Sequence, residues 1–196
     1  EGGLSSHHLA GGADLVYQIG TAKYGVRDEN GHFSDEKLKA LANIKQIKMF
    51  EIKLSQGAKP GKGGILPGKK VTAEIAKIRG IPEGEASISP NAHPEIKCVG
   101  DILDMVAYIR QVTGKPVGFK FVLGHTQWLT DLLTEITQRG PQSAPDFMTL
   151  DSADGGTGAA PQPLIDYVGL PLKESLPLLV NMLEKYNLRE QVKIIA

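Results

Sequence analysis

The sequence predicts an α/β fold in which parallel strands alternate with helices. Apolar runs of strand length recur along the chain, as at 48–54, 116–123 and 146–151. Segments with apolar residues at helical spacing separate them, so the pattern indicates successive right-handed βαβ units. Polar, glycine-rich segments follow two of these strands, which is where parallel sheets carry their ligand-binding loops.

The first half of the chain contains four predicted elements. Residues 14–19 form a short strand, and Ser34 is a suitable N-cap for a helix over 35–46. A strand over 48–54 and a helix over 71–79 follow. The two helices are indicated by apolar residues at helical spacing, namely Leu38, Leu41, Ile44, Ile75 and Ile78.

The second half repeats the pattern more clearly. After a long irregular segment at 80–98, which contains three prolines, a helix is predicted over 100–113 and a strand over 116–123. The next helix, over 128–139, precedes a strand over 146–151. A glycine stops each of these helices, which is a common C-terminal signal.

A helix over 176–186 and a strand over 192–196 complete the series, so the chain has about four to five strands. Two architectures remain open, a doubly wound sheet and a (β/α)8 barrel. A complete barrel needs about 250 residues, so a barrel of this length is incomplete. The chain starts at Glu1 without a methionine and stops within the last strand. We therefore expect residues 1–196 to form one partial domain, truncated at both ends.

Composition excludes several classes of function. Acidic and basic side chains balance at 22 each, which argues against nucleic acid and anionic membranes as partners. No stretch has the apolar length of a transmembrane segment. The single Cys98 excludes a disulfide within the chain, so a reducing, cytoplasmic location is expected. Cys98 itself is expected to be a small packed residue. Adjacent His7 and His8 point in different directions, so we predict no metal site and a disordered terminus.

The segment 53–64 indicates an anion-binding loop. It reads Lys-Leu-Ser-Gln-Gly-Ala-Lys-Pro-Gly-Lys-Gly-Gly and directly follows an apolar strand. Three lysines and Gln56 supply donors, and the glycines permit positive φ or the close approach of a ligand. A solvated basic loop is the alternative, but so many glycines cost backbone entropy without a structural need. The spacing is not that of a Walker loop.

Two further features lie after the next strands. Lys120 interrupts an apolar strand, where a lysine is costly unless its charge is partnered or reaches solvent at the strand end, and the pattern leaves both possibilities open. The loop 154–159, Asp-Gly-Gly-Thr-Gly-Ala, could hold a phosphate or a polar ring edge on its backbone amides. It is not the dinucleotide fingerprint.

Several motifs together resemble the FMN-binding synthase domain of the glutamate synthase family, and they occur in the same order over nearly the whole chain. They are Glu-Gly-Gly at 1–3, Glu-Ile-Lys-Leu-Ser-Gln-Gly-Ala-Lys-Pro-Gly at 51–61, Ile-Ser-Pro at 88–90 and Asp-Gly-Gly-Thr-Gly-Ala at 154–159. The stand-alone, domain-2-type members are the most similar, since the resemblance extends to His-Leu at 8–9 and Ile-Arg-Gly at 78–80.

The resemblance implies a (β/α)8 barrel of TIM type, present here as an incomplete barrel of about four to five strands, with FMN at the carboxyl ends of the strands. It implies that hydride from reduced flavin converts 2-iminoglutarate, formed from 2-oxoglutarate and ammonia, into L-glutamate. In the large enzymes the ammonia comes from glutamine. The implied electron donor is ferredoxin or a reductase subunit.

The resemblance also assigns roles to individual residues. Gln56, Lys59 and Arg79 surround 2-oxoglutarate, and arginine can bind a carboxylate with two hydrogen bonds. Glu1 corresponds to a catalytic glutamate near the imine, as a hydrogen-bond acceptor or proton relay. Lys53 is implied to act both in catalysis and near the flavin. The other implied flavin contacts are Gln56, Lys120, Asp154, Gly155, Gly156, Thr157 and Gly158.

This chain departs from the family pattern in three respects. The FMN phosphate loop, the cysteines of a 3Fe–4S cluster and the amidotransferase domain of the large enzymes are not in this sequence. Two alternatives therefore stand beside glutamate formation. One is a flavin enzyme for another amine, such as one forming N-methylglutamate, and the other is a scaffold without FMN or catalysis.

Overall fold

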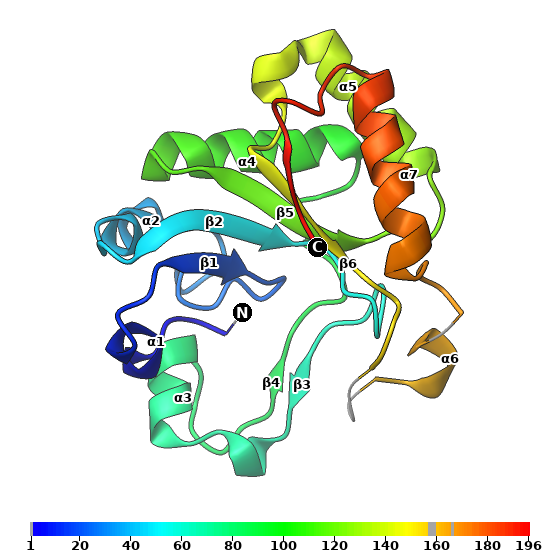
Figure 1. The fold of residues 1–196 in the computed structure, drawn as a ribbon. Helices are drawn as coiled ribbons and strands as arrows, with labels where there is room; N and C mark the ends of the chain where they lie inside the picture. Colours follow the sequence, from blue (N-terminus) through cyan, green and yellow to red (C-terminus); the bar gives the residue numbers. More distant parts are fainter. Residues whose placement is uncertain (1, 157–159, 166) are drawn as a thin grey trace.

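Five parallel strands form the main sheet of the computed structural model, which describes residues 2–156, 160–165 and 167–196 (Figure 1). The strands are β1 (Leu15–Ile19), β2 (Ile47–Lys53), β5 (Val117–Val122), β6 (Phe147–Asp151) and β7 (Lys193–Ile195), in that spatial order. Each strand lies beside the next one in sequence, whereas a doubly wound sheet reverses its order at a switch point. The prediction of an incomplete (β/α)8-type fold is confirmed, and within the described ranges the sheet does not close.

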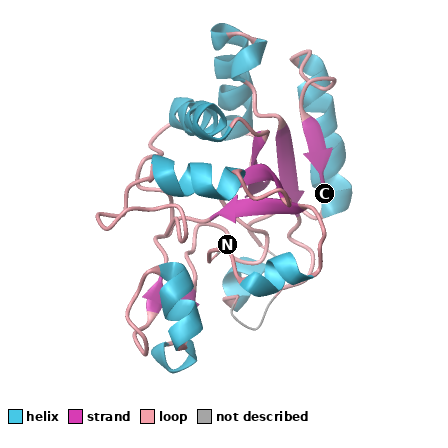
Figure 2. Ribbon diagram, turned by 90° about the vertical axis from the view of Figure 1, so that its left-hand side faces the viewer, coloured by secondary structure: helices cyan, strands magenta, loops and turns pink. Residues whose placement is uncertain are grey.

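The long helices cover one face of this sheet (Figures 1 and 2). They are α2 (Asp35–Ala42), α4 (Val99–Thr113), α5 (Gln127–Arg139) and α7 (Leu172–Lys185). Right-handed crossovers between sequential parallel strands all fall on the same side, which explains the single helical layer. The predicted N-cap Ser34 accepts a hydrogen bond from the Lys37 N–H at 3.3 Å. Helix α2 ends earlier than predicted because a turn from Ile44 to Ile47 leads the chain into β2.

The two faces of the sheet differ in chemistry because side chains alternate along each strand. On the helical side lie fully buried aromatic and aliphatic residues, including Phe50, Ile52, Phe119, Phe121 and Leu150. Each such side chain stabilises the fold by roughly 1.5–3 kcal/mol. The opposite face is polar, and its central side chains are Gln18, Glu51, Lys53, Lys120, Thr149 and Asp151. This polar face is the one that the interior of a barrel would enclose.

Residues 54–96 leave the sheet after β2 and form an arm, which extends away from the strands in Figure 2. Its elements are β3 (Ile65–Leu66), the 3-10 helix η1 (Gly68–Lys70), α3 (Ala73–Arg79) and β4 (Ser87–Ile88), with β3 and β4 antiparallel. Helix α1 (Ser6–Ala10) lies against α3, since the Ser5 hydroxyl donates to Glu74 Oε1 at 3.2 Å. The arm therefore carries α3 away from the sheet and places it beside α1.

Two expectations about local structure were wrong. The amino-terminal segment was expected to be disordered, but α1 forms there because Ser5 and His8 make a reciprocal capping box. Cys98 was expected to be packed, but it is exposed at the N-cap of α4. The 3-10 helix η2 (Pro141–Ser143) and α6 (Gln162–Ile165) are too short to give a periodic signal. In the described ranges no helix combines the length and apolarity needed to cross a membrane.

Candidate functional site

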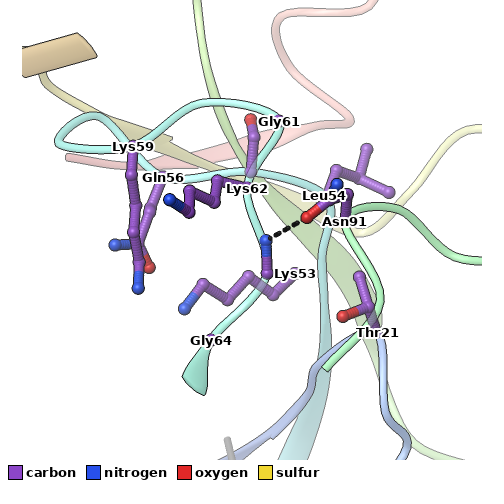
Figure 3. Close-up of a pocket in the computed structure, with 11 residues that line it drawn as sticks. Thr21, Lys53, Leu54, Gln56, Lys59, Gly61, Lys62, Gly64 and Asn91 are labelled. Atoms are coloured by element: carbon purple, nitrogen blue, oxygen red, sulfur yellow. Dashed lines mark hydrogen bonds between the residues drawn. The ribbon is translucent and has the colours of Figure 1, made fainter. Parts of the chain in front are cut away.

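The loop after β2 lines a cavity of about 100 Å³ at the carboxyl end of that strand. Lys53, Gln56 and Lys59, which the sequence singled out, all line it, and Lys62 joins them (Figure 3). The remaining lining residues are Thr21, Leu54, Ser55, Gly61, Gly63, Gly64 and Asn91. The predicted loop residues therefore meet in one cationic cavity.

Close backbone contacts require glycine at two positions of this loop, Gly57 and Gly63. A Cβ atom built on Gly57 would lie 1.5 Å from the Ser152 carbonyl oxygen, and one on Gly63 would lie 2.1 Å from that of Ser89. Hydrogen bonds fix the same two points. The Gly57 N–H donates to Asp151 Oδ2 at 3.1 Å, and the Gly63 N–H donates to Asn91 Oδ1 at 2.9 Å (dashed line in Figure 3).

Lys120 forms an ion pair with Asp151, with 3.2 Å between Nζ and Oδ2. In the parallel register Lys120 lies directly beside Lys53, so two cations stand together on the polar face. Asp151 also accepts hydrogen bonds from the Gly57 N–H and, at 3.0 Å, from the Ser152 N–H, so it links Lys120 to the loops after β2 and β6. No motif in the sequence pointed to Asp151. Its position as the last residue of a predicted strand was the available signal.

A second missed carboxylate, Glu51, joins three strands of the polar face. Its side chain accepts hydrogen bonds from Gln18 Nε2 at 2.6 Å and Thr149 Oγ1 at 2.5 Å. Gly118 lies between Glu51 and β6 in the register and adds no side chain, so the carboxylate can reach across β5. Glu51 is only 7% exposed. Its two hydrogen bonds hold β1 and β6 to β2, the strand that ends at Lys53.

Arg79 lines a second cavity, of about 210 Å³, together with Lys59. Helix α3 ends at Arg79, and Gly80 caps it in the left-handed conformation with φ of +62°. Lys59 and Gly64 line both cavities, so the two spaces are neighbours. The fold thus brings Arg79 to the loop that carries Lys59.

The glycine loop after β6 is partly described. The Asp154 carboxylate accepts hydrogen bonds from the Ser152 hydroxyl and, at 2.8 Å, from the Leu172 N–H, and these bonds lower the pKa of Asp154. The Asp154 carboxylate therefore binds the backbone at the start of α7. Gly155 has φ of +76° and open space around it, so its backbone is unobstructed. The predicted site residues Glu1, Thr157 and Gly158 lie outside the described residues.

An ion pair between the buried Lys23 and the partly exposed Glu95 links the end of the arm to the connection between β1 and α2. Lys23, only 4% exposed and with φ of +50°, pairs with Glu95, and the Thr21 hydroxyl donates to the Pro90 carbonyl at 2.6 Å. Burial alone would raise the pKa of Glu95, but the hydrogen bond and charge of Lys23 lower it overall. These contacts tie the β1–α2 connection to residues that border the cavity.

Replacing Glu95 with glutamine is expected to lower the free energy of unfolding by about 1–3 kcal/mol, because Lys23 stays buried without a counter-charge; Glu95 is partly exposed, so the loss is smaller than for a fully buried pair. The folded-state pKa of Glu95 lies below its unfolded value. The pair therefore stabilises the protein above the unfolded value of about 4.5 and loses this effect as pH falls through the folded pKa. Urea unfolding of both proteins at pH 7 and pH 3 measures this, and an equal difference at the two pH values would contradict it.

Fold and cavity together define an α/β domain of barrel type with a cationic, glycine-rich cavity at the carboxyl ends of its strands. The chain belongs to the glutamate synthase family, because residues 1–196 match the family model described as the conserved region in glutamate synthase. The family resemblance of the sequence motifs is thereby confirmed. No group of three or more potential metal-binding side chains occurs in the portion that the structure describes.

Known relatives match the chain along its whole length. It is 46% identical over 196 residues to the glutamate synthase large subunit-like protein YerD of Bacillus subtilis, and 34% identical over 198 residues to the archaeal glutamate synthase [NADPH] of Methanocaldococcus jannaschii. It covers 37% and 35% of these two proteins. The ferredoxin-dependent glutamate synthase of Antithamnion sp. is 34% identical over 97% of the chain, which covers 11% of that protein.

Proposed function

We propose that this chain carries the substrate face and part of the flavin face of an FMN-dependent oxidoreductase that forms L-glutamate from 2-oxoglutarate and ammonia, either free or derived from glutamine. The observation that carries the proposal is the meeting of Lys59 and Arg79 in one cavity. The names of the relatives, which include NADPH-dependent and ferredoxin-dependent glutamate synthases, support it. Ferredoxin or a reductase subunit is the proposed electron donor. The lone Cys98 fits a reducing cytoplasm.

The substrate assignment rests on charge and geometry. A 2-oxo dicarboxylate needs fixed cations at its two ends, and Arg79 and Lys59 line one space of about 210 Å³. The arginine fork suits two parallel hydrogen bonds to one carboxylate, while lysine acts as a point charge. Gln56, in the adjoining cavity, offers an amide donor to the carbonyl or imine end of the substrate.

The residues at the strand ends fit a bound flavin. Lys53 and Lys120 stand side by side in the register of β2 and β5, and two ammonium groups at one place would favour an anionic ring edge. Gly155 and Gly156 present backbone without side chains on the neighbouring loop. Reduced FMN, when bound, supplies the hydride for the imine carbon. Thr157 and Gly158 are proposed to extend this contact.

The protein's own groups then hold and orient the reactants. Arg79 and Lys59 fix the carboxylates, and Gln56 orients the reacting end between the two cavities. Lys53 keeps a positive charge where the reduced cofactor carries a negative one. Glu1 is proposed to accept a hydrogen bond from the imine and to relay its proton.

The test uses the complete polypeptide that contains this sequence, loaded with FMN and reduced chemically. Addition of 2-oxoglutarate and ammonia is expected to reoxidise the flavin and yield one glutamate for each flavin reoxidised. Methylamine in place of ammonia is the comparison, and faster reoxidation with methylamine would favour N-methylglutamate formation. A colourless protein that takes up no FMN would instead support the scaffold alternative.

A further inference from the structure

The guanidinium of Arg79 is held by two residues that the proposed function leaves without a role. Arg79 Nη1 donates a hydrogen bond to the Ser87 hydroxyl at 2.8 Å, and Arg79 Cζ lies 5.0 Å from the centre of the Tyr24 ring. The two supports are linked, because the Ser87 and Tyr24 hydroxyl oxygens are 2.6 Å apart. Tyr24 and Ser87 are 6% and 3% exposed.

This support is itself rigid. The Arg27 guanidinium lies over the Tyr24 ring with its Cζ at 4.8 Å, and the buried Tyr17 hydroxyl donates to the Tyr24 carbonyl at 2.8 Å. Burial raises the pKa of Tyr17, so this donor keeps its proton over the physiological range. Gly2 lies beside the guanidinium on another side, since a Cβ atom built there would be 3.1 Å from Arg79 Nη2.

Arg79 has no counter-charge among residues 2–156, 160–165 and 167–196, because no carboxylate there lies within ion-pair distance of it. A half-buried guanidinium without an acidic partner is suited to an anionic ligand. The cavity that Arg79 lines also contains Lys59, so the fork of Arg79 is oriented at a space that is already cationic.

We propose that Tyr24 and Ser87 are positioning residues that hold the Arg79 guanidinium in the orientation needed for two parallel hydrogen bonds to a carboxylate of the 2-oxo acid. The inference rests on the proposed function, since it deepens the role of the same cavity. Tyr24 fixes the plane of the fork by stacking, and Ser87 fixes its rotation by a hydrogen bond. The Ser87 hydroxyl and the Tyr24 ring act through Arg79, and the ring also borders the cavity that Arg79 lines.

The test compares Ser87→Ala and Tyr24→Phe with two matched controls in the complete FMN-loaded polypeptide. Ser175→Ala removes a buried serine hydroxyl that bonds the Pro171 carbonyl, and Tyr186→Phe removes a phenol hydroxyl near Thr134. Ser87→Ala is expected to raise the KM for 2-oxoglutarate about tenfold, with kcat within about twofold and FMN affinity unchanged. Tyr24→Phe keeps the stacked ring and removes only the hydroxyl beside Ser87, so its KM should rise less, by about threefold. The controls should leave all three values near those of the wild type.

A second arm repeats Ser87→Ala in an Arg79→Lys background. A residue that acts through Arg79 loses its effect there, so the additional rise in KM should disappear, whereas a residue with a general structural role keeps it. Calorimetric titration of the wild type with 2-oxoglutarate separates the two proposals. No binding overturns the proposed function and this inference with it, while normal binding with unchanged KM in both site variants overturns this inference alone.

Discussion

Replacing Arg79 with glutamate is expected to raise the KM for 2-oxoglutarate by about 100-fold, while the affinity for FMN changes little. The substitution removes a charge-assisted pair of hydrogen bonds and puts a negative charge beside the substrate carboxylate, and the combined loss is about 3 kcal/mol. Arg79 lines the cavity it shares with Lys59 and not the one at Lys53. Steady-state kinetics and FMN titration on the complete polypeptide measure the two effects separately.

Lys77→Glu is the matched control, because it makes the same charge reversal on the same helix at an exposed position. It should change the KM by less than threefold, as expected for a screened surface charge. Since Arg79 also stacks on Tyr24, thermal melting must accompany the kinetics. A fall in FMN affinity equal to the rise in KM would contradict the assignment of Arg79 to the substrate.

Replacing Gly57 with alanine is expected to be the most damaging single substitution in the loop. The new Cβ atom would meet the Ser152 carbonyl oxygen at 1.5 Å, so the loop after β2 and the loop after β6 must separate. That movement also breaks the hydrogen bond from the Gly57 N–H to Asp151. We expect a loss of about 3 kcal/mol in the free energy of unfolding, from overpacking together with the lost hydrogen bond. Substrate and flavin binding should weaken together.

The control for this prediction is Gly64→Ala in the same loop. Gly64 has no positive φ, and the nearest atom to a Cβ there is the Ser89 hydroxyl oxygen at 4.0 Å. Alanine at this position should be neutral within about 0.5 kcal/mol. Urea unfolding of the two variants and the wild type gives the comparison. Equal stability of the Gly57 and Gly64 variants would show that the close contact does not constrain the loop.

The strands and long helices could be predicted from the sequence because each carries its own periodic signal. The strand order could not, since doubly wound sheets and barrels share the same local alternation. Only the direction of successive crossovers separates them, and that direction is a property of the whole chain. β3 and β4 have two residues each, too few for any pattern to emerge.

The candidate site shows the same division. Lys53, Gln56 and Lys59 could be grouped because they share one loop after a strand. Arg79 lies 20 residues beyond Lys59, and only the family resemblance joined them, since no local signal indicates that the arm folds back. Asp151 was passed over as the end of an apolar strand. A charged residue next to a buried strand needs a partner, and that rule could have directed attention to Lys120.

The two contacts at Gly57 and Gly63 also determine where the chain can change in length. The loop is hydrogen-bonded to Asp151 at one point and to Asn91 at the other, and its backbone passes close to Ser152 and Ser89 there. An inserted residue between Gly57 and Gly63 would displace one of these hydrogen bonds. We therefore expect this segment to tolerate neither insertions nor deletions. Lengthening a surface loop that makes no such contacts adds little to the entropic cost of closing it. The turn at residues 28–31, whose Gly31 has open space around it, is such a loop.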